Sequence, residues 1–454
     1  MLTQHVRCLD VVKDQRVPAC RPTLQKPPTL SSSRPSVACR ASNSNGSAGL
    51  QHSRKDHDVI GLSNLCVDIV IPVQQLPPAD PEARQGLLQQ LTAEPPDEQH
   101  WELGGNCNFM IAAARMGMRV GSIGHVGNDT YGRYMDRVLQ EERIEAITRI
   151  MPATLSGTDL DRTLLCFVLV DPEGKHAFCS RYDFGPWPLL GGVSSLPASV
   201  TQVLQSTAAV FTNGFVFDEL PLELVKQAIR TASDAGAAVL FDPGPRAFTM
   251  KSGSRRAALD TLISLSDVVL MTEEEAVEVT GLNDPQAAAE AVLARPGCKT
   301  EWCVVKLGGE GALLVTKSPQ LEVYRAGAFK VDVKDTVGCG DSFAAAIVLG
   351  YTRTHDVHAT LLLANAVGAA TATGRGAGTN VADAKTVHEL LQQAAVDCNG
   401  NGVQRHDLEK ALHILHDSLS SAELLHLINT SSSGSSSSSG NSSRQQKTPA
   451  AHAA

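Results

Sequence analysis

Hydrophobic positions in the central part of the chain alternate between short apolar runs and longer amphipathic segments. The apolar runs are rich in Val, Ile and Leu, which is typical of buried strands, and they read DVIGLSNLCVDIVIPV, AAVFTNG, AAVLFDP, DVVLMT and CVVKLG. The amphipathic segments predict helices and include residues 221–235, 273–280, 284–294 and 356–372. This alternation predicts an α/β fold in which helices cover both faces of a mainly parallel sheet. Ligands of such a sheet bind at the carboxyl ends of its strands.

One segment interrupts this alternation. Residues 163–181 contain two apolar runs joined at Pro-Glu-Gly, and this pattern predicts a β-hairpin. Residues 77–100 are rich in Pro, Glu and Gln and predict an insertion on the surface. The alternation continues beyond both segments, so we expect one large α/β domain.

Charge is unevenly distributed along the chain. The 454 residues have a formal net charge of −9, but residues 1–55 contain nine Lys or Arg and two Asp or Glu. The remainder therefore carries −16, and an acidic surface repels nucleic acids and anionic lipids. A hydrophobic content of 43% with only 4% aromatic residues suits an α/β core packed with Ala, Val and Leu.

Both ends of the chain differ in composition from its centre. Residues 1–55 are rich in Arg and Ser, which predicts a transit peptide for the chloroplast first and the mitochondrion second, with a disordered tail as the alternative. Residues 430–454 predict a disordered Ser/Gly-rich tail. Between them we expect the α/β domain at 56–396 and a helical extension at 397–429. No apolar run is long enough to span a membrane, and the eleven cysteines contain no CxxC pair, which favours reduced thiols.

Residues 335–343 read Asp-Thr-Val-Gly-Cys-Gly-Asp-Ser-Phe and lead directly into the apolar segment AAAIVLG. Two glycines allow a tight turn with outward-pointing amides, and the following helix adds the positive end of its dipole. This pattern predicts a site that stabilises phosphate charge without a lysine. Asp341 stands beside it, where it could accept a proton from an attacking hydroxyl. The alternative is that Asp341 only caps the helix.

A second segment narrows this interpretation. Residues 104–132 contain a Gly-Gly turn, an amphipathic helix, a strand and a Gly-Asn-Asp turn. GGNCN at Gly104 and DTVGCGD at Asp335 together resemble the two signature regions of the pfkB (ribokinase-like) carbohydrate kinase family. The resemblance implies a ribokinase-like fold, with a mainly parallel, doubly wound sheet flanked by helices. It also implies a small β-sheet lid made of residues about 64–103 and 163–183.

The resemblance assigns roles to the glycine-rich motif. Asp341 would be the general base, and the amides of Gly338, Cys339 and Gly340 would form an anion hole for the transferring phosphoryl group. Cys339 departs from the usual Ala of the family. The helix dipole favours its thiolate and Asp341 disfavours it, so we expect a modest net effect on the thiol pKa. Cys339 is then either a redox-sensitive position or merely a slightly larger Ala.

The resemblance also implies a binding site for the hydroxyl groups of the acceptor. It would consist of Asp68, Gly104, Gly105 and Asn108. Asp68 lies in the apolar run LCVDIVIP, where an unpaired carboxylate is costly, so we expect it at a strand end facing a polar partner. The alternative for both Asp68 and Asn108 is a capping role.

The nucleotide would lie beside the segment KLGGEGALLV, which resembles the strand and turn next to ATP in the family. Lys306, Gly308 and Gly311 would contact ATP, and Asn365 would lie near the adenine. Asp335 and the loop 374–378 resemble a site for a monovalent cation such as K⁺.

Two positions depart from the family pattern near the expected Mg²⁺. Thr272 replaces the Asn of an Asn-x-x-Glu motif, whereas Glu275 keeps the carboxylate and would hold Mg²⁺ through water. A solvated acidic helix start is the alternative for this segment. Gly244 replaces the Asn of an Asp-Pro-Asn-x-Arg turn at Asp242–Arg246.

The sequence therefore predicts an ATP- and Mg²⁺-dependent kinase of a small, ribose- or fructose-like sugar. A nucleoside kinase of the same family and a catalytically inactive partner in a plastid assembly are the alternatives. We expect no nucleic-acid or membrane partner, and a homodimer formed through the lid. The absence of the GxxxxGK[ST] and GxGxxG signatures excludes P-loop and dinucleotide-binding sites of those types.

Overall fold

The computed structural model describes residues 55–149, 161–397 and 405–433, apart from the single positions Ser63, Ala79, Gly174, Pro186 and Gly376. Of the predicted transit peptide at 1–55 and the predicted tail at 430–454, residues 1–54 and 434–454 lie outside the described residues. Residues 430–433 of the predicted tail belong to the helix α14 (Ser421–Ser433).

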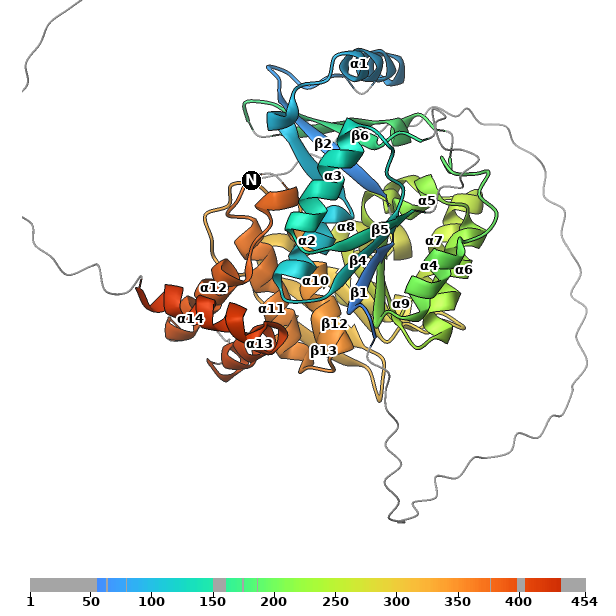
Figure 1. Cartoon of the computed structure of the whole chain (residues 1–454). Coiled ribbons are helices and arrows are strands. Elements are labelled where there is room, and N and C mark those ends of the chain that lie inside the picture. Colours follow the sequence, from blue (N-terminus) through green and yellow to red (C-terminus); the bar gives the residue numbers. More distant parts are fainter. Residues whose placement is uncertain are drawn as a thin grey trace, which may run out of the picture.

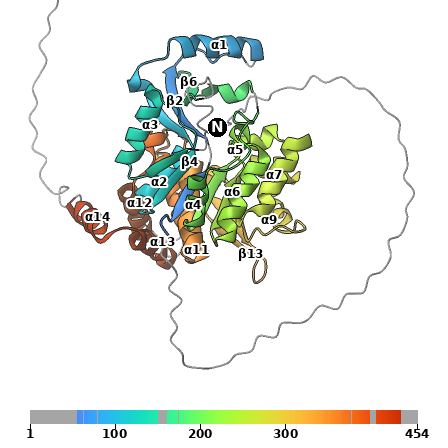
Figure 2. The same cartoon turned by 45° about the vertical axis from the view of Figure 1, so that its right-hand side comes forward.

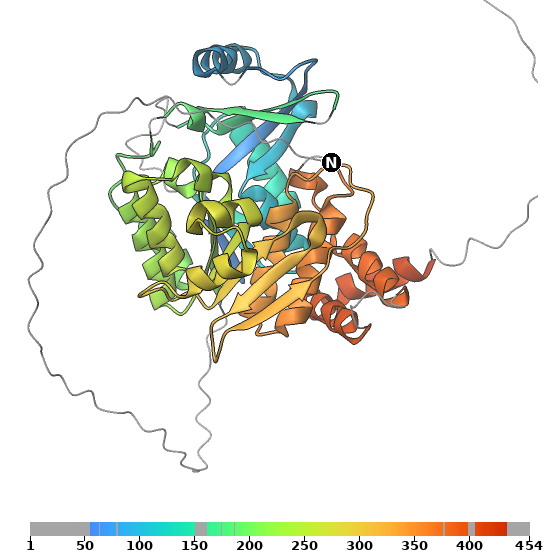
Figure 3. The same ribbon diagram turned by 180° about the vertical axis from the view of Figure 1, so that it is seen from behind.

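A nine-stranded sheet forms the centre of the described structure. In spatial order its strands are β13 (Glu322–Ala326), β12 (Ala312–Thr316), β11 (Trp302–Lys306), β10 (Val268–Thr272), β9 (Ala238–Asp242), β8 (Ala209–Asn213), β1 (Val59–Leu62), β4 (Val120–Gly124) and β5 (Glu145–Arg149). Neighbours from β11 to β5 are parallel, whereas β12 and β13 pair antiparallel at one edge, which is seen from behind in Figure 3. The predicted mainly parallel sheet is confirmed.

Successive residues of each strand serve two separate cores. In β10, Val268 and Leu270 belong to one buried cluster, whereas Val269 and Met271 belong to the other. Helices therefore cover both faces, as predicted (Figure 2). The first face carries α2 (Cys107–Arg115), α3 (Thr130–Glu141), α10 (Cys339–Thr352), α11 (Val357–Thr371), α12 (Ala384–Val396) and α13 (Arg405–Ser418). The second carries α4 (Ala198–Gln205), α6 (Leu222–Asp234), α7 (Gly253–Leu265), α8 (Glu273–Thr280) and α9 (Pro285–Leu293).

A second, four-stranded sheet lies above the central one (Figure 1). Its order is β3 (Trp101–Gly105), β2 (Leu65–Pro72), β6 (Leu164–Val170) and β7 (His176–Ser180). β6 and β7 form the predicted antiparallel hairpin, and β6 runs parallel to β2. These strands come from the two segments predicted for the lid. The predicted surface insertion contains the helix α1 (Pro81–Ala93).

The remaining described helices are short or lie near the end of the chain. α5 (Val216–Glu219) follows β8, and α14 (Ser421–Ser433) follows α13. The short 3-10 helices are Glu98–His100, Arg181–Asp183, Gly244–Thr249, Gly308–Glu310 and Gly378–Asn380. No helix among the described residues is long and apolar enough to cross a membrane.

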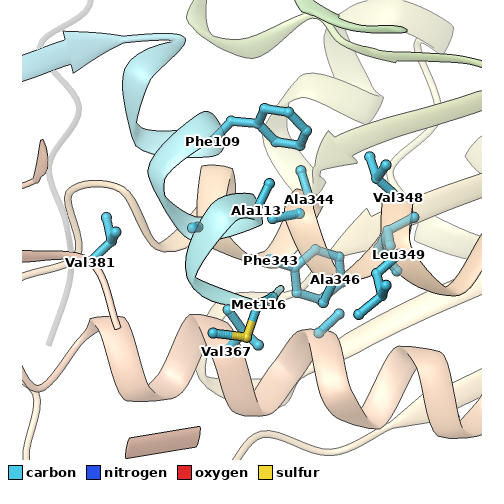
Figure 4. Close-up of a cluster of buried hydrophobic side chains, with 14 of the residues drawn as sticks. Phe109, Ala113, Met116, Phe343, Ala344, Ala346, Val348, Leu349, Val367 and Val381 are labelled. Atoms are coloured by element: carbon cyan, nitrogen blue, oxygen red, sulfur yellow. The ribbon is translucent and has the colours of Figure 1, made fainter. Parts of the chain in front are cut away.

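Two helices from distant parts of the chain pack tightly under the second sheet. Ala113 of α2 lies beside Ala344 of α10, and Met116, which directly follows α2, lies beside Val367 of α11 (Figure 4). The first turns of α2 and α10 are therefore held in a fixed relation, and each carries a predicted site residue.

Candidate active site

The first turn of α10 contains Asp341 as its third residue. The N-cap of this helix is Gly338, which has a φ of 78° that other residues rarely adopt. Asp341 is therefore not the capping residue, and its partly buried side chain is available for another role.

Asn108 connects the two signature segments. Its side-chain amide Nδ2 donates to Asp341 Oδ2 at 3.3 Å, and its Oδ1 accepts a hydrogen bond from the Gly378 amide at 2.8 Å. The N-cap of α2 is Asn106, so the alternative that Asn108 caps this helix is wrong. Asn108 thus orients the Asp341 carboxylate and ties it to the loop before η6 (Gly378–Asn380).

The surroundings of Asp341 raise its pKa to about 6. Burial is the main cause, and the negative charge of Asp242 acts in the same direction. Lys306 and the hydrogen bond from Asn108 oppose this rise. A carboxylate with such a pKa is ionised at neutral pH and is still basic enough to accept a proton.

The predicted anion hole differs from expectation in two respects. The amide of Cys339 donates to the Thr336 carbonyl at 3.3 Å, so it is already engaged within the turn. A lysine is also present, because a Cβ placed on Gly340 would lie 3.4 Å from Lys306 Nζ. The expectation of a cradle without a lysine was therefore wrong.

Burial raises the pKa of the Cys339 thiol to about 12, and Asp335 and Asp341 add to this effect. The helix dipole does not offset these causes, so the modest net effect expected from the sequence was wrong. The Cys339 thiol is protonated at neutral pH, which disfavours a reactive thiolate.

Asp68 lies in the middle of β2, not at a strand end as expected. Its carboxylate faces Gly104, where any Cβ would lie 2.1 Å from Asp68 Oδ1. Gly104 thus leaves room for this carboxylate against the neighbouring strand. Cys66 Sγ donates to Asp68 Oδ1 at 3.2 Å, and Glu102 pairs directly across from Asp68 in β3.

Asp68 is buried, and burial raises its pKa to about 7. The charges of Glu102 and Asp341 raise it further, whereas the hydrogen bond from Cys66 lowers it. The charge of Asp341 on α10 therefore acts on Asp68 of the second sheet. Gly105 is the last residue of β3 and has a φ of 60°.

Charged residues gather at the carboxyl ends of three neighbouring strands. Lys306 ends β11 and its Nζ lies 2.5 Å from Asp242 Oδ2 at the end of β9. Thr272 ends β10 and caps α8, and the carboxylate of Glu275 accepts a hydrogen bond from the Thr272 amide at 2.8 Å. Glu275 is only 5% exposed, so the solvated acidic helix start is wrong for this residue. Burial, with the charge of Asp242, raises the Glu275 pKa to about 7.

The other residues expected near ATP shape the turns around β12 and β13. Gly308 and Gly311 have positive φ values of 56° and 99°, and a Cβ on Gly311 would lie 2.0 Å from the Ala326 carbonyl oxygen. Asn365 donates to that same carbonyl at 2.9 Å and to the Gly327 carbonyl at 3.2 Å. In this structure Asn365 therefore holds the backbone that follows β13.

Asp335 is held between the turn and the second sheet. Its Oδ1 accepts a hydrogen bond from the Val337 amide at 3.0 Å, and its Oδ2 lies 4.0 Å from His176 Nε2 on β7. The neighbouring loop 374–378 contains Gly376, which lies outside the described residues.

Several residues near the site were not singled out from the sequence. Asp242 was expected only as part of a turn, although an Asp that directly follows an apolar strand was a usable signal. Glu102 and His176 gave no comparable signal, because their approach depends on how the second sheet pairs and closes. A cavity of about 880 Å³ also lies beside this sheet, lined by Tyr182, Glu219 and residues of α1 and α3 but by none of the predicted site residues.

Comparisons with known proteins agree with this arrangement. The model of the family described as "pfkB family carbohydrate kinase" matches residues 63–384. A 5-dehydro-2-deoxygluconokinase 2 from Bacillus cereus is 27% identical over 301 residues, which are 64% of this chain and 82% of that protein.

Two solved structures show the same ribokinase-like fold. A candidate ribokinase II from E. coli in complex with ATP and Mg²⁺ has a TM-score of 0.59 at 21% identity, over 74% of this chain and 99% of that chain. Arabidopsis thaliana ribokinase complexed with ribose and ATP has a TM-score of 0.57 at 17% identity, over 74% and 98% of the two chains. At these identities the likeness establishes the fold alone.

Proposed function

This chain belongs to the pfkB family of carbohydrate kinases, and from that membership we propose that it transfers the terminal phosphoryl group of ATP to a hydroxyl group of a small sugar. The observation that carries this proposal is the pairing of Asp341 with Asn108 at the start of α10. It puts a partly buried carboxylate with a pKa of about 6 beside the glycine turn, and the charge of this carboxylate raises the pKa of Asp68 on the second sheet.

The proposed reaction assigns the proton to Asp341. The acceptor oxygen forms a bond to the terminal phosphorus, the bond from that phosphorus to ADP breaks, and the hydroxyl proton passes to an Asp341 oxygen. The amide of Asn108 holds the carboxylate in position. Asp68 would bind other hydroxyls of the acceptor, and the second sheet would exclude water, the competing acceptor.

The residues present fit Mg²⁺ bound together with ATP. Within the described part of the chain, no three His, Cys, Asp or Glu side chains are grouped closely enough to hold a metal by themselves. Mg²⁺ commonly uses one or two carboxylates, water and substrate phosphates, so it does not require such a group. Asp242 and the buried Glu275 lie next to Lys306 and would contribute through water. Bound ATP and Mg²⁺ supply the phosphoryl group and neutralise its charge.

K⁺ is a further part of this proposal. Asp335 stands next to the Ala372 carbonyl, which accepts a hydrogen bond from the Lys334 amide at 2.9 Å. Carboxylate and carbonyl oxygens are suitable ligands for a hard cation. Replacing KCl by choline chloride at equal ionic strength should lower the rate if K⁺ binds there, and equal rates would remove K⁺ from the proposal.

The acceptor is tested by a screen for ADP release with ribose, fructose, 5-dehydro-2-deoxygluconate and adenosine. The sugar acid 5-dehydro-2-deoxygluconate is included because the Bacillus cereus relative is named a 5-dehydro-2-deoxygluconokinase. We expect turnover with a sugar, and we expect the substitution Asp341→Asn to abolish this turnover. Turnover with adenosine alone would support the nucleoside kinase instead. No turnover with any acceptor would favour the inactive structural partner.

We also propose that residues 1–55 direct the protein to the chloroplast, that residues 56–396 form the kinase domain and that residues 397–429 form a helical extension. Leu408 and Leu415 of α13 lie in the same core as α10 and α11, which supports packing of this extension on the domain. A fusion of residues 1–55 to a fluorescent protein would test the targeting.

Dimerisation through the second sheet belongs to the same proposal. Phe178 on β7 and Trp187 after it are 46% and 51% exposed, although both are large and apolar. Such residues often mark protein contacts. Light scattering should give a dimer mass that Phe178→Ser lowers, and a monomeric wild type would contradict the dimer.

A further inference from the structure

Lys306 occupies the centre of the charged groups at the carboxyl edge of the central sheet. It ends β11, and its Nζ lies 2.5 Å from Asp242 Oδ2 at the end of β9. Both side chains are largely buried, at 14% and 10% exposure. β10 lies between these strands, with Thr272 directly opposite Lys306. The ion pair therefore spans the end of the intervening strand.

The same ammonium group reaches the glycine turn. A Cβ on Gly340 would lie 3.4 Å from Lys306 Nζ, so the ammonium lies against the first turn of α10. The amides of a first helical turn have no intrahelical acceptor and carry partial positive charge. The Lys306 ammonium thus adds a full positive charge beside the partial positive charge at the start of α10.

The charge on Lys306 persists despite its burial. The carboxylate of Asp242 lies 2.5 Å from Lys306 Nζ and compensates the ammonium charge. An ammonium group has three N–H donors, and Asp242 accepts from one of them. Two donors therefore remain for oxygen atoms of a ligand or for other neighbours.

We propose that Lys306 is a catalytic residue of the phosphoryl transfer, whose ammonium contacts the transferring phosphoryl group while Asp242 positions it. This inference rests on the proposed kinase function. Lys306 keeps its proton throughout, because the acceptor proton passes to Asp341. Its contribution is positive charge that is already in place when negative charge spreads over the phosphoryl oxygens.

A purely structural role makes a different prediction. If Lys306 only neutralises Asp242, then Lys306→Met should change ATP and ADP affinity equally, and removing both charges should restore stability. If Lys306 contacts the phosphoryl group, the double variant should regain stability without regaining activity. The comparison therefore needs Lys306→Met, Asp242→Asn and the combination of both.

Lys299 provides a matched control. Its Nζ also forms an ion pair, at 3.0 Å from Asp267 Oδ2, but at the opposite ends of β10 and β11. Lys299→Met removes the same chemical group from an ion pair far along the strands from Gly340. We expect it to leave kcat unchanged even if the melting temperature falls.

The test combines steady-state kinetics, melting temperatures and calorimetric titration with ATP and with ADP. We expect Lys306→Met to lower kcat by about 100-fold or more, as is typical for loss of one preorganised charge-stabilising donor. The double variant should melt closer to the wild type but keep the low kcat. Because the contact is to the terminal phosphoryl group, ATP affinity should fall at least about tenfold while ADP affinity changes little.

Two results would overturn the inference: a Lys306→Met enzyme within about tenfold of the wild-type kcat, or a double variant that regains wild-type kcat. The nucleotide titrations separate this inference from the proposed function. If the wild type turns over no acceptor, the kinase proposal fails. The titrations of Lys306→Met still decide whether Lys306 contacts the terminal phosphoryl group, because that contact predicts a lower affinity for ATP and an unchanged affinity for ADP. Equal effects on both nucleotides would exclude that contact.

Discussion

The side-chain amide of Asn108 donates a hydrogen bond of 3.3 Å to the carboxylate of Asp341, across 233 positions of the sequence. Asn108 lies in the first turn of α2, directly after β3, so this bond links the second sheet to the helix that carries the predicted base. The packing of α2 against α10, where Ala113 lies beside Ala344, keeps the two helix starts together. The geometry of the base therefore depends on residues at opposite ends of the domain.

Replacing Asp341 by Asn should remove the proton acceptor and keep the shape. We expect kcat to fall by about 100-fold or more, with ATP affinity and melting temperature close to those of the wild type. Steady-state kinetics and calorimetry measure these quantities. The exposed acid Glu223 serves as the control, because Glu223→Gln should change none of them. Turnover of Asp341→Asn within tenfold of the wild type would show that another group takes the proton.

The pH dependence of kcat/KM should report the Asp341 carboxylate. Its pKa of about 6 means that the active, ionised form is lost as the pH falls, so kcat/KM should decline below about pH 6 and level off above it. Asn108 lowers this pKa through its hydrogen bond. Asn108→Ala should therefore move the acidic limb to higher pH. An unchanged acidic limb in this variant would mean that the limb belongs to a different group.

The strand and helix pattern could be predicted because strands that are buried on both faces consist of continuous apolar runs in the sequence. The apolar run DVVLMT supplies both cores through alternate residues, and it forms β10. The edge strand β13, Glu322–Ala326, mixes charged and apolar residues and gives a much weaker signal.

The electrostatics of the site could not be predicted in the same way. For the run Thr272–Glu275 the sequence left open a Mg²⁺-positioning Glu275 and a solvated helix start, and the fold exposes Glu273 and Glu274 but buries Glu275 in a capping box. Likewise, Lys306 meets Gly340 only because the end of β11 lies beside the start of α10. Such pKa values and contacts arise from tertiary neighbours, which a single sequence does not specify.

Gly104→Ala should impair binding of the acceptor selectively. A Cβ at this position would lie 2.1 Å from Asp68 Oδ1, so the carboxylate or the strand must shift. We expect the acceptor KM to rise by about tenfold or more, while the KM for ATP stays within about twofold. Gly86→Ala in α1 is the matched control, because a Cβ there meets no atom within 4 Å. Equal changes in the two KM values would contradict a local effect on Asp68.

Glu219→Gln should stabilise the protein at alkaline pH. Burial raises the Glu219 pKa from 4.5 to about 8, so the folded state holds a proton that the unfolded state releases between these values. Wild-type stability therefore falls as the pH rises from about 5 to 8 and levels off above that range. Glutamine has no such proton, so the variant should gain on the order of 2 kcal/mol over the wild type at pH 9 and little at pH 5. Urea unfolding at both pH values measures this difference, and a gain that does not depend on pH would contradict it.

Cys339 tests whether the glycine turn is sensitive to oxidants. Its thiol has a pKa of about 12, so very little thiolate is present at neutral pH, and thiolate is the form that reacts. We therefore expect wild type and Cys339→Ala to lose activity at the same rate under hydrogen peroxide, both with and without ATP. Mass spectrometry should find Cys339 unmodified when other cysteines have reacted. A redox switch would instead be established if Cys339→Ala were inactivated more slowly than the wild type and if dithiothreitol restored the activity of the oxidised wild type. The reason is that an oxidised sulfur would put bulk and negative charge where the phosphoryl group must lie.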